Sequence, residues 1–181
     1  ALALAATVLC LALPGWAATK EERQADVRQS AQQTLDRLYK LQPRAKAAVE
    51  KSAGYAVFSN FGMKLLMAGG GTGQGVAVDR TSKREVFMKM VEVQAGLGFG
   101  VKKFQLVWIF ETQKAFNDFV VSGWEIGAQA NATAKRGDQG AWAAGALSVS
   151  PGVWLYQLTD DGLAAELTVK GTRYYVDSEL N

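Results

Sequence analysis

The chain has 181 residues, with no histidine, one cysteine, and 20 Lys and Arg against 17 Asp and Glu, which gives a net charge of +3. Without histidine the commonest general base, the commonest zinc ligand and the usual catalytic triads are missing. These counts argue against most hydrolases and metalloenzymes. We therefore expect a non-enzymatic protein with no catalytic residue, no metal and no cofactor.

Residues 1–17 are predicted to be a signal peptide. An apolar run stops at Pro14, and at about thirteen residues it is shorter than the roughly twenty that a membrane-spanning helix needs. Small residues follow, and cleavage is expected after Ala17, with Gly15 two positions before it. Cys10 lies inside the run after Thr-Val-Leu, which does not fit a lipobox, so lipidation there is not favoured. We expect an exported protein, periplasmic or associated with the outer membrane.

Residues 18–53 are predicted to be an N-terminal helical segment. Thr19 and Glu22 have the spacing of a capping box, and four apolar residues then recur every three or four positions: Val27, Ala31, Leu35 and Leu38. A second short helix is expected after Pro43, ended by Gly54 in a left-handed conformation. The apolar stripe can pack on the rest of the domain or contact a membrane, and the sequence leaves both open.

Residues 54–181 are predicted to form a glycine-rich β domain. Strand-like runs with turn residues between them are expected at 55–59, 75–79, 84–96, 103–111, 124–134, 141–150, 153–159 and 163–171. One helix interrupts them, capped by Thr112 and presenting Ala115, Phe116, Phe119 and Val120. The expected fold is α+β: N-terminal amphipathic helices packed on a curled, mostly antiparallel sheet, as a sandwich or small barrel, with one short internal helix.

A glycine cluster follows the first predicted strand and runs into the second. Its members are Gly69, Gly70, Gly71, Gly73 and Gly75. Successive backbone amides can bind an anion, but the cluster has neither P-loop nor dinucleotide-binding spacing and leads into a strand. Bent β-structure is therefore the favoured interpretation, and a phosphate-binding loop is the alternative.

The order of motifs from about residue 35 to residue 181 resembles the SYLF, or Ysc84-type, family of lipid-binding domains. The matching pieces are the A-G-Y-A-V-F entry strand at 53–58, the apolar lead into a glycine cluster at 65–79, the second glycine run and strand at 95–110, the short helix with its strand at 115–134, and the closing segment at 156–181. Where many members have a Gln in the second glycine run, this chain continues through Gly98 to Val101 into two lysines.

The resemblance implies binding of anionic phospholipids, with phosphoinositides and actin regulation as the eukaryotic and fungal versions. An exported bacterial protein would meet phosphatidylglycerol or cardiolipin instead. The basic residues expected at the headgroup are Arg23, Arg28, Arg37, Lys40, Lys64, Lys102 and Lys103, because a cation beside exposed amides suits a phosphodiester. Residues 20–51 hold eight Lys and Arg and five Asp and Glu, so the whole +3 excess lies in the helical segment.

Two other functions stay open. The first is a structural or protein-interaction module of the envelope, in which aromatic strand residues contact a partner: Trp108, Trp124, Trp142 and Trp154. The second is a carboxylate enzyme, which needs two acids from Asp118, Glu125, Asp160, Asp161 and Glu166 to converge in a buried cleft. Asp160 and Asp161 stand directly before Gly162, where a turn is the ordinary explanation. Nucleic-acid binding is not expected from so modest a charge.

Overall fold

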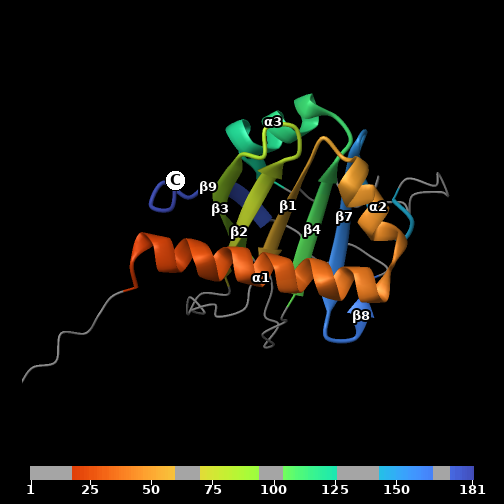
Figure 1. Ribbon diagram of the computed structural model, residues 1–181, viewed down its shortest axis with the longest axis horizontal. Helices are drawn as coiled ribbons and strands as arrows, with labels where there is room; N and C mark the ends of the chain where they lie inside the picture. Colours follow the sequence, from red (N-terminus) through yellow and green to blue (C-terminus); the bar gives the residue numbers. More distant parts are fainter. Residues whose placement is uncertain (1–17, 60–69, 94–103, 126–142, 165–171) are drawn as a thin grey trace, which may run out of the picture.

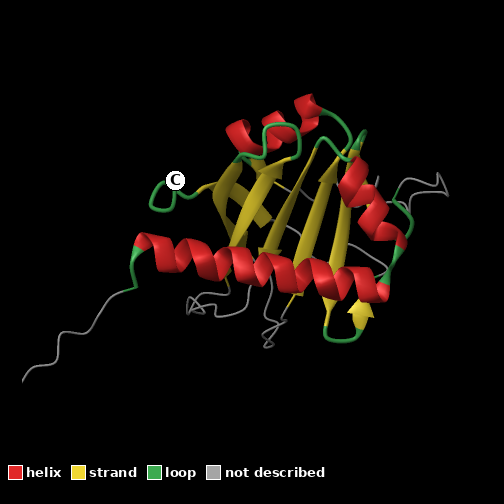
Figure 2. Ribbon diagram, in the orientation of Figure 1, coloured by secondary structure: helices red, strands yellow, loops and turns green. Residues whose placement is uncertain are grey.

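A computed structural model describes residues 18–59, 70–93, 104–125, 143–164 and 172–181. The predicted signal peptide, with Cys10, lies outside these residues. The described chain forms an α+β fold in which helices pack on one curled antiparallel sheet, as predicted (Figures 1 and 2). The described strands curl into a half-barrel.

The sheet contains nine described strands, all paired antiparallel. They are β1 (Gly54–Ser59), β2 (Gly70–Asp79), β3 (Glu85–Val93), β4 (Phe104–Phe110), β5 (Trp124–Glu125), β6 (Leu147–Ser150), β7 (Val153–Thr159), β8 (Gly162–Leu163) and β9 (Thr172–Val176). Their order across the sheet is β5-β9-β3-β2-β1-β4-β7-β6, and β8 pairs with β7. The C-terminal strand β9 therefore lies between β5 and β3, next to strands that precede it by many residues.

Helix α1 (Lys20–Leu41) crosses the outer face of the sheet (Figure 1). The predicted capping box is present: Glu22 N donates to Thr19 Oγ1 at 3.2 Å, and Thr19 N donates to Glu22 Oε2 at 2.8 Å. Val27, Ala31, Leu35 and Leu38 are all buried in one cluster with outward-facing strand residues. The apolar stripe therefore packs on the sheet in this structure, and the alternative in which it faces a membrane does not describe the docked helix.

Helix α2 (Arg44–Lys51) packs beside α1, but its predicted end is wrong. The cap is Ser52, and Gly54 already belongs to β1 with no left-handed φ. Gly54 has another reason to be glycine, because a Cβ there would lie 2.3 Å from the Phe116 ring. A glycine required by close packing gives the same sequence signal as a helix C-cap.

Most strand predictions agree with the described residues, but β2 begins at Gly70, five residues before the predicted run, and the strand expected at 124–134 is described only at Trp124–Glu125. Residues 143–146 form a turn rather than a strand, closed by Ala146 N donating to Ala143 O at 2.9 Å. Of the strand expected at 163–171, Leu163 belongs to β8, Ala164 follows outside a strand, and residues 165–171 lie outside the described residues. Strand β9 (Thr172–Val176) is not among the predicted strands.

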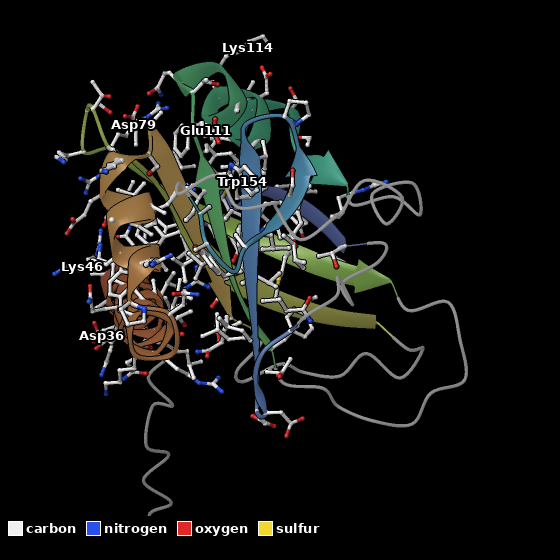
Figure 3. All side chains as sticks on the ribbon, turned by 90° about the vertical axis from the view of Figure 1, so that its right-hand side faces the viewer. Asp36, Lys46, Asp79, Glu111, Lys114 and Trp154 are labelled. Carbon is white, nitrogen blue, oxygen red and sulfur yellow. The ribbon has the colours of Figure 1, made fainter. Side chains whose placement is uncertain are left out.

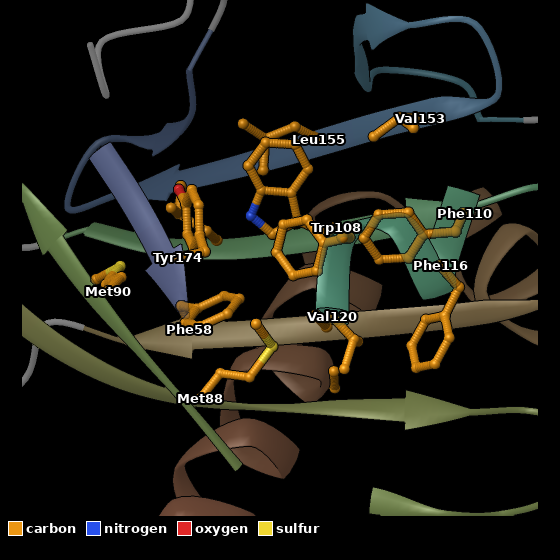
Figure 4. Packing of buried hydrophobic residues seen from close by; sticks show 14 of the residues in the cluster. Phe58, Met88, Met90, Trp108, Phe110, Phe116, Val120, Val153, Leu155 and Tyr174 are labelled. Atoms are coloured by element: carbon orange, nitrogen blue, oxygen red, sulfur yellow. The ribbon is translucent and has the colours of Figure 1, made fainter. Parts of the chain in front are cut away.

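The inner face carries an aromatic core beneath helix α3 (Gln113–Ser122) (Figure 4). As predicted, Thr112 caps α3 by accepting from Ala115 N at 3.2 Å, and the helix buries Phe116, Phe119 and Val120. The rings of Phe58 and Trp108 lie 4.9 and 5.3 Å, centroid to centroid, from the ring of Tyr174. Large interlocking rings fill the hollow of the half-barrel at this level.

Candidate functional site

The four cationic residues predicted on α1 do not form one cluster. Arg23 and Lys40 are 17 positions apart, which is roughly 25 Å along a helix axis. Arg23 pairs with Glu179 at 3.3 Å, and Arg28 pairs with Glu85 at 2.7 Å while its guanidinium lies 5.0 Å from the centre of the Phe87 ring. The first half of the helix therefore directs these two cations to acids of its own domain.

Arg37 belongs to a polar network between α1 and the sheet. It donates to Gln105 Oε1 at 2.9 Å and to the backbone carbonyl of Thr159. Gln105 in turn donates to Thr34 Oγ1 at 2.7 Å, and Thr34 donates to Ser30 O at 2.8 Å. Thr34 and Gln105 are buried, so these bonds replace water that the burial removes. Arg37 is thus a structural cation as well as a candidate headgroup contact.

Lys40 differs from the other three because it is exposed and its side chain makes no hydrogen bond or ion pair within the described ranges. Leu41, beside it, exposes 46% of its surface, and Arg44 at the start of α2 is also exposed. We call Lys40, Leu41 and Arg44 the helix corner. The two cationic side chains have no partner among the described residues, and an exposed apolar side chain lies between them. Surfaces that touch a membrane peripherally often have this composition.

The helix corner lies near one end of the sheet, which we call the Ser59 end. Ser59 ends β1 opposite Gln105, Phe104 begins β4 opposite Thr159, and Gly70 begins β2 opposite Val93. Arg37, one helical turn before Lys40, bonds to Gln105 and Thr159 at this end. The strand ends that flank residues 60–69 and 94–103 therefore lie at the same end of the sheet, and the last turns of α1 lie beside β4 and β7 at this end (Figure 1).

The remaining predicted cations fall in those two segments. Lys64, Lys102 and Lys103 lie outside the described residues, as does Gly69. Their part in headgroup contact stays a prediction.

The other predicted glycines are in strand β2 rather than in a loop: Gly70, Gly71, Gly73 and Gly75. A Cβ at Gly73 would lie 2.3 Å from Met90 Cε, and a Cβ at Gly75 would lie 2.3 Å from the backbone oxygen of Val57. Gly75 also pairs with β1 on one side and β3 on the other. Glycine here lets the strands and the Phe58 ring approach closely. The described glycines therefore belong to β-structure, which the sequence favours, and not to an anion-binding loop.

Two side chains away from the Ser59 end have shifted pKa values. The backbone amide of Ser82 holds the pKa of the Asp79 carboxyl below its usual value, against the opposing effect of burial, and Thr81 N and Gln113 Nε2 also donate to Asp79. Burial raises the pKa of Tyr39 to about 12, so this phenol between α1 and the sheet stays neutral. Neither group has the pKa of a general acid or base at neutral pH.

The described acids of the enzyme alternative do not converge. Asp118 pairs with Lys114 at 2.6 Å on α3, whereas Asp160 and Asp161 are exposed in the turn after β7, at the Ser59 end. The Glu125 side chain and Glu166 lie outside the described part of the chain. Among the residues that the structure describes, no three His, Cys, Asp or Glu gather as metal ligands would.

The tryptophans of the interaction alternative have different environments. Trp108 is fully buried in the inner core and cannot meet a partner, so this part of the hypothesis is wrong. Trp154 is partly exposed and donates to Glu111 Oε1 at 2.6 Å (Figure 3). Trp142 and the Trp124 side chain are outside the described residues. None of the described helices is both long and apolar enough to cross a bilayer.

Comparison with known families agrees with this fold and these motifs. Residues 91–181 match the family model Ysc84, described as Las17-binding protein actin regulator. The chain belongs to the Ysc84 family. The family is known for lipid binding and actin-related roles.

One curated relative of this Ysc84 domain is "Beta cell expansion factor A" of Aeromonas veronii. It is 32% identical over 162 residues, which cover 90% of this chain and 60% of the relative. The chain therefore spans about 60% of the length of the relative that it matches.

Sequence reasoning missed two groups of residues in this Ysc84 domain. Leu41 and Arg44 were not chosen, although an exposed leucine beside cations at a helix end is a readable signal. Residues 177–181 carry no predicted element or role, yet they contact α1 and β3. No periodicity marks such a segment, because its contacts come from single polar side chains and one buried leucine.

Proposed function

We propose that this domain binds anionic phospholipids without catalysis, in the periplasm or at the outer membrane of a bacterial cell envelope. The contact surface is the Ser59 end of the domain, through the helix corner and the segments that carry Lys64, Lys102 and Lys103. Membership of a lipid-binding family supports the ligand class. The observation that carries the proposal is the helix corner, where Lys40 and Arg44 flank exposed Leu41.

The charges of this surface favour a lipid headgroup over a deep ligand site. Each Lys or Arg near an anionic membrane contributes about 1 kcal/mol, and an exposed leucine adds apolar contact. Asp160 and Asp161 lie at the same end and oppose anions there, so binding of moderate strength and strong dependence on salt is expected.

Vesicle co-sedimentation tests the proposal. The chain should bind phosphatidylcholine vesicles that contain phosphatidylglycerol and not vesicles of phosphatidylcholine alone. Binding should weaken between about 0.1 M and about 1 M salt, where the Debye length falls from about 10 Å to about 3 Å. Equal binding to both vesicles, or no effect of salt, would refute an electrostatic headgroup contact.

A pair of charge-matched variants tests the location. Lys40→Gln with Arg44→Gln removes two cations from the helix corner, and binding should fall roughly thirtyfold, as expected for about 2 kcal/mol. Lys46→Gln with Lys51→Gln removes two exposed cations from α2, outside the corner, and should change binding little. The triple change Lys64→Gln, Lys102→Gln and Lys103→Gln should also weaken binding. A similar loss in the two double variants would mean that only net charge matters.

A protein-interaction function is the second candidate, and one observation favours it. Val121 on α3 exposes 81% of its surface, and Val176 on β9, the strand next to α3, exposes 40%. Exposed apolar side chains of this kind can bind a protein. If Val121→Ser abolishes capture of an envelope protein and leaves vesicle binding unchanged, the two functions use different surfaces.

A further inference from the structure

The last five residues, 177–181, fold back from the end of β9 toward α1. Asp177 N donates to the backbone oxygen of Phe87 at 2.9 Å, which carries the strand pairing one residue past β9. Leu180 N and Asn181 N then both donate to Asp177 O at 3.2 Å. This turn brings the end of the segment against the outer face of the sheet, where the first half of α1 lies.

Two residues anchor this segment to the domain. Leu180 is fully buried, in the cluster that contains Val27 and Ala31 of α1. The Asn181 side chain bonds both backbone groups of Phe87: Phe87 N donates to Oδ1 at 3.0 Å, and Nδ2 donates to Phe87 O at 2.8 Å. The amide thus pairs with β3 as a peptide group of a neighbouring strand would.

The first turns of α1 contact the same segment through polar groups. Lys20 Nζ donates to Asn181 O at 2.7 Å, Gln24 Nε2 donates to Leu180 O at 2.6 Å, and Arg23 pairs with Glu179. These three positions share one face of the helix. No residue of α1 before Val27 is buried, so the beginning of the helix has little apolar contact of its own.

The base of the segment is fixed by a buried charge. The Asp177 side chain is fully buried and accepts from Lys89 Nζ at 3.1 Å and from Glu179 N at 3.0 Å. Lys89 also lies 3.5 Å from Glu179. The segment therefore has a firmly attached base on β3 and an outer part, Glu179–Asn181, whose polar contacts with α1 are partly exposed although Leu180 itself is buried.

We propose that residues 177–181 are a clasp that controls the docking of residues 20–31 of α1, so that opening the clasp exposes the Val27 and Ala31 side of the helix while the sheet stays folded. That the exposed side then meets lipid rests on the proposed function. The clasp itself depends only on the contacts described above.

The two halves of α1 differ in the way that such a device requires. Beyond Ala31 the helix is attached by fully buried Leu38, by Leu35, and by the Thr34–Gln105–Arg37 network. Before Val27 it is attached by the clasp, through exposed polar bonds that water can replace. Local opening of weakly buried segments is common in folded proteins, and here it would end near Thr34.

Hydrogen exchange of the full chain tests the clasp. Asn181→Ala removes both bonds to Phe87, and amides 24–31 should then exchange roughly tenfold faster, as should Phe87 N. Amides 106–109 in β4 should not change. Gln24→Ala breaks the clasp from the helix side and should speed exchange of the same helical amides. Asn117→Ala removes an asparagine that accepts from Gln113 on α3, and is the matched control.

The outcomes separate the clasp from the lipid proposal. Unchanged exchange at 24–31 in both variants would overturn the clasp, because the helix would then not depend on residues 177–181. An equal rise in β4 would also overturn it, because helix and sheet would then open as one unit. Phosphatidylglycerol vesicles supply the second arm: Asn181→Ala should bind them several-fold more tightly than Asn117→Ala. Equal binding with a loosened helix would refute control of lipid access. If the unmodified chain binds no such vesicles, the proposed function fails and the exchange result still decides the clasp.

Discussion

The inner and outer faces of the sheet are packed by different means. The inner face buries rings from β1, β4, β9 and α3, with Phe58, Trp108, Phe119 and Tyr174 in mutual contact. The outer face buries mainly aliphatic residues, together with Phe87 and Tyr156, under α1 and α2, and it includes the Arg37 network and the clasp. Burial of aromatic rings dominates the inner face. On the outer face, hydrogen bonds and ion pairs help to position helix α1.

This difference assigns separate roles to the two faces. A core of large rings tolerates no opening, because each displaced ring loses a large contact area. Polar contacts with partial exposure contribute little net free energy, since water can replace them. Stability is therefore expected to depend mainly on the inner face, and conformational change to occur on the outer face.

The largest expected effect tests the inner face. Trp108→Ala should lower the free energy of unfolding by about 4 kcal/mol, because it removes a fully buried ring from a packed cluster. Urea denaturation measures the change. Val121→Ala, which shortens an exposed residue of α3, should shift the midpoint little. A small loss for Trp108→Ala would show that the inner core is not the main source of stability.

The second prediction concerns backbone spacing within the sheet. Gly75→Ala should cost about 2 kcal/mol, because the new Cβ would lie 2.3 Å from the Val57 oxygen and 2.4 Å from the Phe58 ring. Thermal unfolding checks it, with Gln74→Ala in the same strand as the control. If Gly75→Ala melts with the unmodified chain, the strands do not approach as closely as described.

The third prediction separates a structural cation from a free one on the outer face. Arg37→Met should cost about 1 to 2 kcal/mol, because it removes the donor to Gln105 Oε1 and to the Thr159 carbonyl. Lys40→Met has no such partner to lose and should leave stability almost unchanged while weakening vesicle binding. Chemical denaturation of both variants measures this, and equal stability losses would contradict the distinction.

The smallest effect is a dependence on pH at the β2–β3 turn. The pKa of Asp79 is lowered in the folded state, so its contribution to stability is present above the ordinary carboxyl pKa and is lost as pH falls through the lowered value. Asp79→Asn should therefore be less stable than the unmodified chain near pH 7, and the difference should shrink on acidification. Thermal melts from pH 7 to pH 3 measure it, and a constant difference would show that charge at Asp79 does not matter.

The sequence predicts well those parts of the fold that depend on local patterns. Thr19 and Glu22, the Val27 to Leu38 stripe, and Thr112 before α3 each carry their signal within a few residues. Strand β9 and the end of α2 are not predicted correctly, because the residues that determine them lie far away in the sequence. Tyr174 is buried against rings from β1, β4 and α3, and Gly54 is required by Phe116.

The candidate site was harder to predict than the fold. A basic residue has the same local signal whether it faces solvent, like Lys40, or completes a buried network, like Arg37. The partners that distinguish them, Gln105 and Thr159, are far along the chain. The clasp raises the same difficulty, since the role of Asn181 depends on its hydrogen bonds to Phe87, which is far away in the sequence.

The position of β9 between β5 and β3 has a consequence for synthesis. Strand β3 cannot pair on its second side, and Leu180 cannot fill its place under α1, until residues 172–181 have left the ribosome. A nascent chain that lacks them has an incomplete sheet and an uncovered outer core. Completion of the described sheet and of the outer core therefore depends on residues 172–181, which lie far along the chain from the strands that they complete.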